Sequence, residues 1–292
     1  MAGLDTKITA TDYNAIQSKI ALVLGTGSGD YGYGQSVSSS SVAVTSKISV
    51  AQWNNLRSDI LRARQHQTGN TESLPTASTS VKITESDRAL YDSMATDTQT
   101  YRAAVPPAGQ ATREDLVPTQ IRTANWNGTL TQYVTITFGD ANAARYFFNT
   151  GSRIEFSGSR SGGVGTTKDV SWTTILTNMG TIYFDRNNTT TTNTGTGSTI
   201  GWADLTGSDQ QIFQKDVSDT TYYPNRYLIY ARAPAANQIV FTIQWLDASG
   251  QPNAPWGTDE DVTGTLTSTV QVYRASGANV TVPTPSAITT GI

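Results

Sequence analysis

Apolar residues in the first hundred positions recur at helical spacing. Two sets show it clearly: Tyr13, Ile16, Ile20 and Val23, then Trp53, Leu56, Ile60 and Leu61. Residues three and four positions apart share one face of an α-helix, so both stretches are predicted to be amphipathic helices. Helices this short are marginal alone, so each is expected to bury its apolar face against another surface.

These helical patterns belong to a unit that occurs three times, at residues 7–20, 47–60 and 82–95. Each copy opens with Lys-Ile followed by Thr or Ser, and Ile16, Leu56 and Tyr91 fall at the same position. The first two copies share an aromatic residue followed by Asn, whereas the third has Arg88-Ala89. Unequal linkers between the copies favour a small helical domain over a stacked solenoid.

The Thr or Ser of each copy is predicted to cap a helix, because its hydroxyl can accept from free amides of the first turn. Asp12 follows Thr9 by three residues and Asp87 follows Thr84 likewise, a capping box with Asp in place of Glu. We expect the apolar positions of these helices to dock the protein onto a partner. The predicted docking residues are Ile8, Tyr13, Ile16, Ile20, Ile48, Trp53, Leu56 and Ile60.

Breaker residues mark the expected ends of the helices and of the domains. The first helix is predicted to end at Leu24, the second near Gln67 and the third before Pro106. The expected organisation is a helical docking domain at 1–105, a Pro/Gly-rich linker at 106–119 and a β-rich domain at 120–292.

The β-rich domain follows from alternation of apolar and polar residues. Leu130, Val134, Ile136 and Phe138 share one face of an alternating stretch, and later strands are predicted at 226–232, 238–246 and 266–274. Short helices are expected at 141–149 and, capped by Ser171, at 172–179, whereas the Thr/Asn/Gly tract 187–199 predicts an exposed loop. The predicted fold class is α+β: N-terminal helices, then a mainly antiparallel β-sandwich with short inserted helices.

Three segments of the chain have distinctive sequences. The first helix runs into a loop, residues 25–35, of the form Gly-Thr-Gly-Ser-Gly-Asp-Tyr-Gly-Tyr-Gly-Gln. The other two are the segment 143–154, with its Ala-Arg-Tyr-Phe-Phe-Asn sequence, and the segment 264–275. All three resemble virion structural proteins of tailed bacteriophages, especially cyanophage-like myoviruses.

The resemblance implies a structural component of a tail, neck or fibre assembly, located in the virion. Its helices would dock it to the particle, and its β domain would project or pack. Other virion proteins and further copies of this chain are the implied partners, and a trimer is expected because phage appendages are symmetric homo-oligomers. The alternative is a carbohydrate-binding module for host attachment.

Composition narrows the classes of partner. Charged residues make up 15% of the chain and the net charge is −3, which gives no electrostatic case for nucleic acid binding. The chain has no cysteine and therefore neither disulfides nor thiolate chemistry. With no visible signal peptide and no apolar run of about 20 residues, we expect a protein made in the host cytoplasm, without membrane insertion.

Candidate catalytic and cofactor motifs are weak. The glycine-rich loop lacks the preceding strand and the Walker lysine of a phosphate cradle, so it predicts a flexible, close-packing linker. The single histidine, His66, has no nucleophile beside it in the sequence and is expected to have a structural role near a helix end. We therefore expect no enzyme activity, no cofactor and no zinc site.

Acidic residues offer two further hypotheses. Asp259-Glu260-Asp261, with Asp247 nearby in sequence, could bind Ca²⁺ but does not match a calcium loop, so a solvated loop is expected. Glu155, Asp204 and Glu260 could be paired as the carboxylates of a glycosidase, although nothing in the sequence singles them out.

The binding alternative rests on aromatic residues near turns. Exposed aromatic rings stack on sugars, and the predicted glycan contacts are Tyr222, Tyr223 and Trp256.

Overall fold

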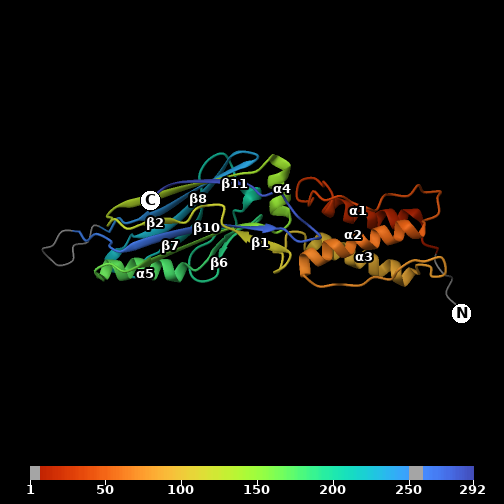
Figure 1. Cartoon of the computed structure of the whole chain (residues 1–292), viewed down its shortest axis with the longest axis horizontal. Helices are drawn as coiled ribbons and strands as arrows, with labels where there is room; N and C mark the ends of the chain where they lie inside the picture. Colours follow the sequence, from red (N-terminus) through yellow and green to blue (C-terminus); the bar gives the residue numbers. More distant parts are fainter. Residues whose placement is uncertain (1–6, 250–258) are drawn as a thin grey trace. The chain divides into compact units, whose positions relative to one another are not determined.

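The chain is an α+β protein, and its computed structural model describes residues 7–249 and 259–292 (Figure 1). Two compact units divide it. The helical unit comprises Met1–Thr112, Arg145–Ser152 and Arg274–Pro283, and the β unit comprises Arg113–Ala144, Arg153–Tyr273 and Thr284–Ile292. The chain first leaves the helical unit after Thr112, within the stretch 106–119, and two later segments belong to that unit again.

Three helices build the helical unit: α1 (Ala10–Leu24), α2 (Val50–Thr68) and α3 (Glu85–Thr100). Each begins at a capping box, in which the cap hydroxyl accepts from the amide three residues on and that residue's side chain accepts from the cap amide. The pairs are Thr9 with Asp12, Ser49 with Gln52, and Thr84 with Asp87. The predicted helix starts are therefore confirmed, and α2 adds a third capping box.

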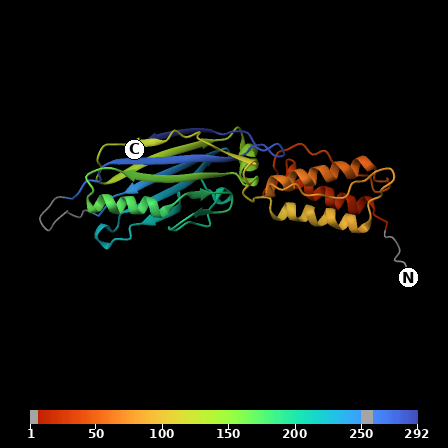
Figure 2. The ribbon, with the colours of Figure 1, turned by 60° about the horizontal axis from the view of Figure 1, so that its bottom comes forward.

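The apolar faces of the three helices, which run side by side in Figure 2, pack against one another. The ring of Trp53 on α2 lies 5.3 Å from that of Tyr13 on α1 and 5.1 Å from that of Tyr91 on α3. Six predicted docking side chains are buried in this core: Tyr13, Ile16, Ile20, Trp53, Leu56 and Ile60. Burying one such side chain contributes about 1.5–3 kcal/mol, so these six hold the bundle together and do not form an open docking face.

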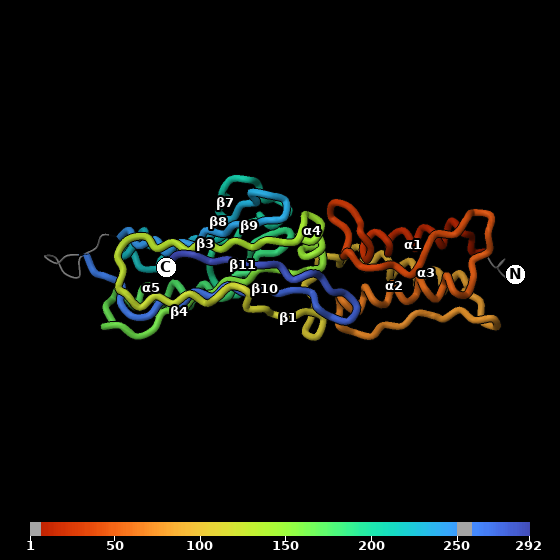
Figure 3. Tube along the Cα trace, turned by 45° about the horizontal axis from the view of Figure 1, so that its top comes forward, coloured from red at the N-terminus to blue at the C-terminus, as the bar shows by residue number. Residues whose placement is uncertain are grey.

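Two extended connections run back along the helices, as Figure 3 shows. We call residues 36–46 the first strap and residues 71–81 the second strap. The Asn14 amide of α1 donates to the Val42 carbonyl at 2.8 Å and accepts from the Val42 amide at 2.7 Å. Asn54 of α2 makes the same two bonds to Ala77, at 3.0 and 3.2 Å. Equivalent asparagines of the first two repeats therefore hold equivalent points of the two straps.

A second repeat position also contacts the straps. Gln17 donates to the Ser39 carbonyl at 3.3 Å, and Arg57 donates to the Leu74 carbonyl at 2.7 Å. Because strap carbonyls and amides are satisfied by helix side chains, the straps can be part of the packed unit without regular secondary structure.

The third repeat is joined to the first without a strap. Its equivalent of the strap-holding asparagines is Ala89, an exposed residue. Instead, the Lys19 ammonium of α1 lies 2.6 Å from the Asp92 carboxylate and 2.9 Å from the Thr96 hydroxyl of α3. An ion pair thus bridges α1 and α3 directly.

The glycine-rich loop is close-packed, as predicted for residues 25–34. Gly34 has a φ of 69°, and a Cβ there would lie 2.3 Å from the ring of Tyr146, so only glycine fits. The Arg145 guanidinium donates to the Thr26 carbonyl at 2.8 Å and also to the Tyr31 carbonyl. These contacts fix the loop, in contrast to the expected flexibility.

The β unit contains two antiparallel sheets in a sandwich-like arrangement. The six-stranded sheet has the order β1-β10-β4-β5-β6, with β2 also paired to β10, and the five-stranded sheet has the order β11-β3-β9-β8-β7. The strands are β1 (Ala111–Glu114), β2 (Gln120–Arg122), β3 (Thr129–Thr137), β4 (Arg153–Ser161), β5 (Ile182–Phe184), β6 (Thr189–Thr191), β7 (Gln210–Asp216), β8 (Arg226–Ala235), β9 (Gln238–Leu246), β10 (Thr265–Ala275) and β11 (Ser286–Gly291).

Aromatic residues join the two sheets. Phe241 of the five-stranded sheet lies with its ring 5.0 Å from that of Phe156 and 5.1 Å from that of Phe184, both in the six-stranded sheet. The inward positions of β3, such as Val134 and Ile136, are fully buried, which confirms the predicted alternation. The inserted helices are α4 (Ala141–Asn149) and α5 (Thr167–Met179).

Two local predictions were wrong. Helix α5 begins after Thr166, whose hydroxyl accepts from the Asp169 amide at 3.1 Å, rather than at Ser171. The capping box starts the helix one turn earlier than the apolar pattern does. The tract 187–199 includes β6, where Thr189 is buried, rather than forming only an exposed loop. Pairing with β5 supplies the backbone partners that the polar composition did not predict.

Candidate functional site

A cavity of about 740 Å³ lies where the openings of the three repeats meet. We call it the N-terminal pocket. Each repeat contributes its Lys-Ile pair to the lining: Lys7 and Ile8, Lys47 and Ile48, Lys82 and Ile83. Because the N-terminal ends of all three helices border one cavity, α1, α2 and α3 run in the same direction, and the straps are the return connections that this requires.

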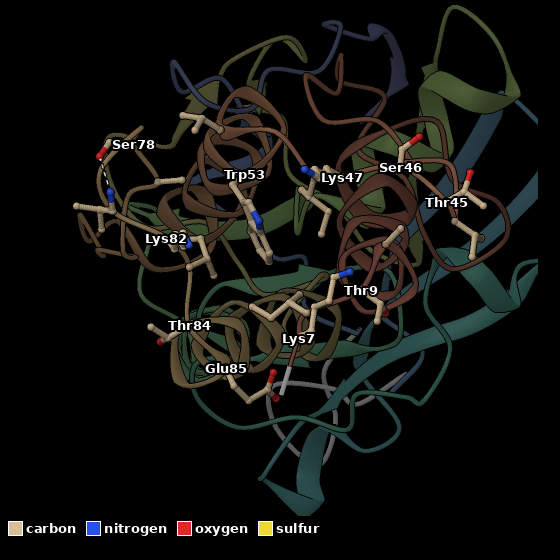
Figure 4. Close-up of a pocket in the computed structure, with 18 residues that line it drawn as sticks. Lys7, Thr9, Thr45, Ser46, Lys47, Trp53, Ser78, Lys82, Thr84 and Glu85 are labelled. Atoms are coloured by element: carbon tan, nitrogen blue, oxygen red, sulfur yellow. Dashed lines mark hydrogen bonds between the residues drawn. The ribbon is translucent and has the colours of Figure 1, made fainter. Parts of the chain in front are cut away.

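The repeat explains why these residue types face the pocket. Each isoleucine directly precedes a helix cap, the position that in a hydrophobic staple packs against the fourth helical residue. That fourth residue is Tyr13 in α1 and Trp53 in α2. Trp53 itself lines the pocket, and Figure 4 shows its ring with Lys7, Lys47 and Lys82 arranged around it. The floor is therefore apolar and the rim is cationic.

The charge of the rim is not neutralised locally. Lys7, Lys47 and Lys82 are all exposed, and within residues 7–249 and 259–292 none of them forms an ion pair. Glu85, the acidic residue of the lining, is paired with Arg88 at 2.8 Å. Half of the six lysines in the chain surround this one cavity. Because the capping carboxylates of Asp12 and Asp87 already match the N-termini of α1 and α3, the three lysines are the main source of positive charge at this pocket.

Titratable groups near the pocket belong to the caps. Hydrogen bonds from Thr9 hold the pKa of Asp12 below its ordinary value, because they stabilise the charged carboxylate. Asp12 is thus ionised and committed to its helix start at neutral pH.

The predicted docking residues fall into two groups. Ile8, Ile48 and Trp53 line the N-terminal pocket, and the first two are half-buried. The other five are buried in the bundle core. The three lysines of the rim were not among the predicted residues, although the repeated Lys-Ile opening was the signal that could have identified them.

The predicted glycan contacts are not brought together as a stacking surface in the described residues. Tyr222 is buried, and its hydroxyl donates to Glu260 at 3.3 Å. Tyr223 is 61% exposed, with the Arg226 guanidinium 5.9 Å from its ring centroid. Trp256 lies outside the described residues.

His66 is a buried structural residue at the end of α2. Its Nε2 lies 3.0 Å from the Thr150 carbonyl and therefore carries the proton, and its ring meets that of Tyr33 edge-on. Burial lowers the pKa of His66 to about 4, opposed by this hydrogen bond. The imidazole is therefore neutral at pH 7, and its hydrogen-bond partner is a backbone carbonyl rather than a hydroxyl group.

The carboxylates considered for glycoside cleavage have other partners. Glu155 is buried between Arg113 and Arg153, at 2.7 and 2.8 Å. Asp204 accepts from the Gly201 amide at 3.1 Å. In the part of the chain that the structure describes, no group of three or more His, Cys, Asp or Glu residues could hold a metal ion, so Asp259-Glu260-Asp261 gains no support as a calcium site.

Comparisons with known proteins do not identify the chain. No family model, no curated protein and no solved structure matches it. Among the described helices, none combines the length and the apolar composition needed to cross a bilayer.

Proposed function

We propose that this chain is a structural component of a tailed-phage virion, in a tail, neck or fibre assembly, and that it has no enzymatic role. The helical unit docks onto another virion protein or a further copy through the N-terminal pocket, and the β unit projects or packs. The observation that carries the proposal is the convergence of three repeats on one lysine-rimmed cavity. A symmetric homo-oligomer, most simply a trimer, fits such an appendage.

The pocket supports docking because its chemistry suits a protein segment. A cavity of about 740 Å³ lies within the usual range for ligand sites. Its Trp53 floor can bury an apolar side chain, and its three lysines can pair with carboxylates that flank it. The segments that resemble virion proteins include the loop directly after α1, within the same unit.

The test replaces the three rim lysines in a phage that encodes this chain. Lys7→Glu, Lys47→Glu and Lys82→Glu together reverse the charge of the rim, and we expect at least a tenfold loss of the protein from purified particles. Lys215→Glu, on β7 of the β unit, is the matched control and leaves incorporation unchanged. Antibody against residues 120–292, viewed by electron microscopy, then places the protein on the particle.

Two results separate the parts of this proposal. Absence of the wild-type protein from purified virions contradicts the virion role. Normal incorporation of the triple variant contradicts docking through the N-terminal pocket but leaves the virion role standing.

The alternative, a carbohydrate-binding module for host attachment, rests on the exposed Tyr223. Such a module predicts that Tyr223→Ala weakens binding to host surface polysaccharide while Tyr222→Phe does not. Turnover of that polysaccharide by the purified protein would contradict a purely structural role.

A further inference from the structure

A fully buried lysine occupies the first turn of α5. Lys168 has no exposed surface, and its ammonium nitrogen lies 2.7 Å from Asp247, 3.0 Å from Asp259 and 2.7 Å from the carbonyl of Glu260. An ammonium ion taken out of water at this depth is costly unless it is fully paired or gives up its proton. Lys168 is therefore held away from water, in contact with two carboxyl groups.

The two carboxyl groups differ. The side chain of Asp247, which follows β9, is fully buried, and this burial raises its pKa against the opposing effect of Lys168. The side chain of Asp259 is 25% exposed and reaches solvent. Asp247 is thus the carboxyl group more readily held as a neutral acid, and Asp259 is the one in contact with solvent.

Asn225 polarises the Asp247 carboxyl from the other side. Its amide nitrogen donates to Oδ1 of Asp247 at 2.5 Å. Its own oxygen accepts from the amides of Ala248 and Ser249, both at 2.8 Å, so the orientation of the amide is fixed. A fixed donor on Oδ1, with the amine facing Oδ2, is the arrangement that stabilises charge developing on a carbonyl oxygen under attack.

We propose that Lys168 and Asp247 join covalently, through an amide bond between the lysine Nζ and the aspartate Cγ, which fastens α5 to the end of β9. This is an activity of the β unit and does not depend on the proposed docking function.

The reaction is a condensation and needs no oxidant or cofactor. Asp259 takes a proton from the Lys168 ammonium, and the resulting amine attacks Cγ of the protonated Asp247. Charge that develops on Oδ1 is stabilised by Asn225. Asp259 then returns the proton to Oδ2, the Cγ–Oδ2 bond breaks, and one water molecule leaves. Asp259 takes the second proton from the nitrogen, which leaves a neutral amide, and releases that proton to solvent through its exposed side. The distances place all four groups in contact before any step occurs, so proximity supplies much of the rate.

Mass spectrometry of the full-length protein tests this directly. We expect the intact mass to be lower than that of the sequence by one water molecule, after incubation at neutral pH. Trypsin does not cleave after an acylated lysine, so digestion is expected to give a branched species that joins residues 161–186 to residues 233–274. Fragmentation of this species places the bond on Asp247.

Variants assign the roles. Lys168→Met is expected to restore the full mass of the sequence. Asp247→Asn is expected to restore it too or to slow formation of the bond strongly. Asp259→Asn keeps the side chain shape and is expected to slow the loss of water at least tenfold, and Asn225→Ala to slow it less. Gln214→Ala, on β7, is the control and leaves the rate unchanged.

An unmodified wild-type mass, with complete cleavage after Lys168, would overturn the proposal and leave an ordinary buried ion pair. A bond to Asp259 instead of Asp247 would also contradict it. If Lys168→Met fails to fold, the wild-type digest alone still decides.

Discussion

The first two repeats of the helical unit and the third are attached to the rest of the bundle by different contacts. Asn14 and Asn54 each hold a strap by two hydrogen bonds to its backbone. The third repeat has Ala89 at that position, and the Lys19–Asp92 ion pair joins it to the first helix instead. The difference follows from chain connectivity, since α3 is the last helix of the three-helix bundle and the chain leaves the helical unit after Thr112.

This comparison explains the departure of the third repeat from the pattern. An asparagine side chain carries both N–H donors and an acceptor oxygen, which match the carbonyl and the amide of an extended backbone. Without a strap, the same amide would gain nothing over alanine, which is the better helix former. The weak sequence match of the third copy is therefore a consequence of its place as the last of the three bundle helices.

The largest expected difference between the strap-held helix α2 and helix α3 is in the response of stability to acid. Helix α2 carries the buried His66. Its pKa is about 4 in the folded protein against an ordinary value of 6.5. As the pH falls, His66 therefore binds a proton in the unfolded chain at a higher pH than it does in the folded protein. The contribution of His66 is fully present above pH 6.5 and falls by about 3 kcal/mol as the pH falls to 4.

Urea denaturation followed by circular dichroism between pH 7 and 4 measures this loss. His66→Gln keeps a donor for the Thr150 carbonyl but does not titrate, so its stability should depend less steeply on pH. Equal slopes for the two proteins would show that His66 is not the cause.

Removal of a strap-holding amide should have the next largest effect. Asn54→Ala breaks two hydrogen bonds and leaves the backbone of Ala77 without its partner, which is expected to cost about 2 kcal/mol. Asn14→Ala should cost about the same, on the order of 2 kcal/mol, if the repeats are equivalent. Chemical denaturation measures both, and hydrogen exchange should show loss of protection at Val42 in one variant and Ala77 in the other. Asn55→Ala, which removes one long bond to Ser38, is the matched control.

The ion pair of the third repeat should matter less. Lys19 and Asp92 are partly exposed, and pairs of this kind contribute about 0–1 kcal/mol. Asp92→Asn is expected to lower the free energy of unfolding by about 0.5 kcal/mol, an effect that salt reduces. A loss as large as that of Asn54→Ala, or one insensitive to salt, would mean that the α1–α3 contact is not mainly electrostatic.

The smallest effect should come from restoring the repeat pattern in the third copy. Ala89→Asn installs the strap-holding residue where there is no strap. Since the position is exposed, we expect a change of less than about 0.5 kcal/mol, slightly destabilising because asparagine is the poorer helix former. Stabilisation by more than this amount would indicate that another segment occupies the strap position of α3.

Local features of the fold were predictable from the sequence because they depend on neighbouring residues. The caps at Thr9 and Thr84, the ends of the first two helices and the alternation of β3 all follow from contacts within a few positions. The repeated Lys-Ile opening was visible too, although its clustering in space was not. Periodicity also correctly separated a helical part from a β-rich part.

The burial of segments whose composition is polar was decided by the tertiary structure alone. The straps are polar and lack periodicity, yet Val42 and Ala77 are buried because distant asparagines satisfy their backbone groups. The sequence pattern of the apolar helix faces suits an external partner and a neighbouring helix equally well. In the structure these faces pack against one another. Burial of Lys168 depends on carboxyl groups about 80 and 90 residues away in sequence, contacts that no local pattern encodes. The sequence by itself determined the local conformations, and the tertiary structure decided which surfaces remained available for function.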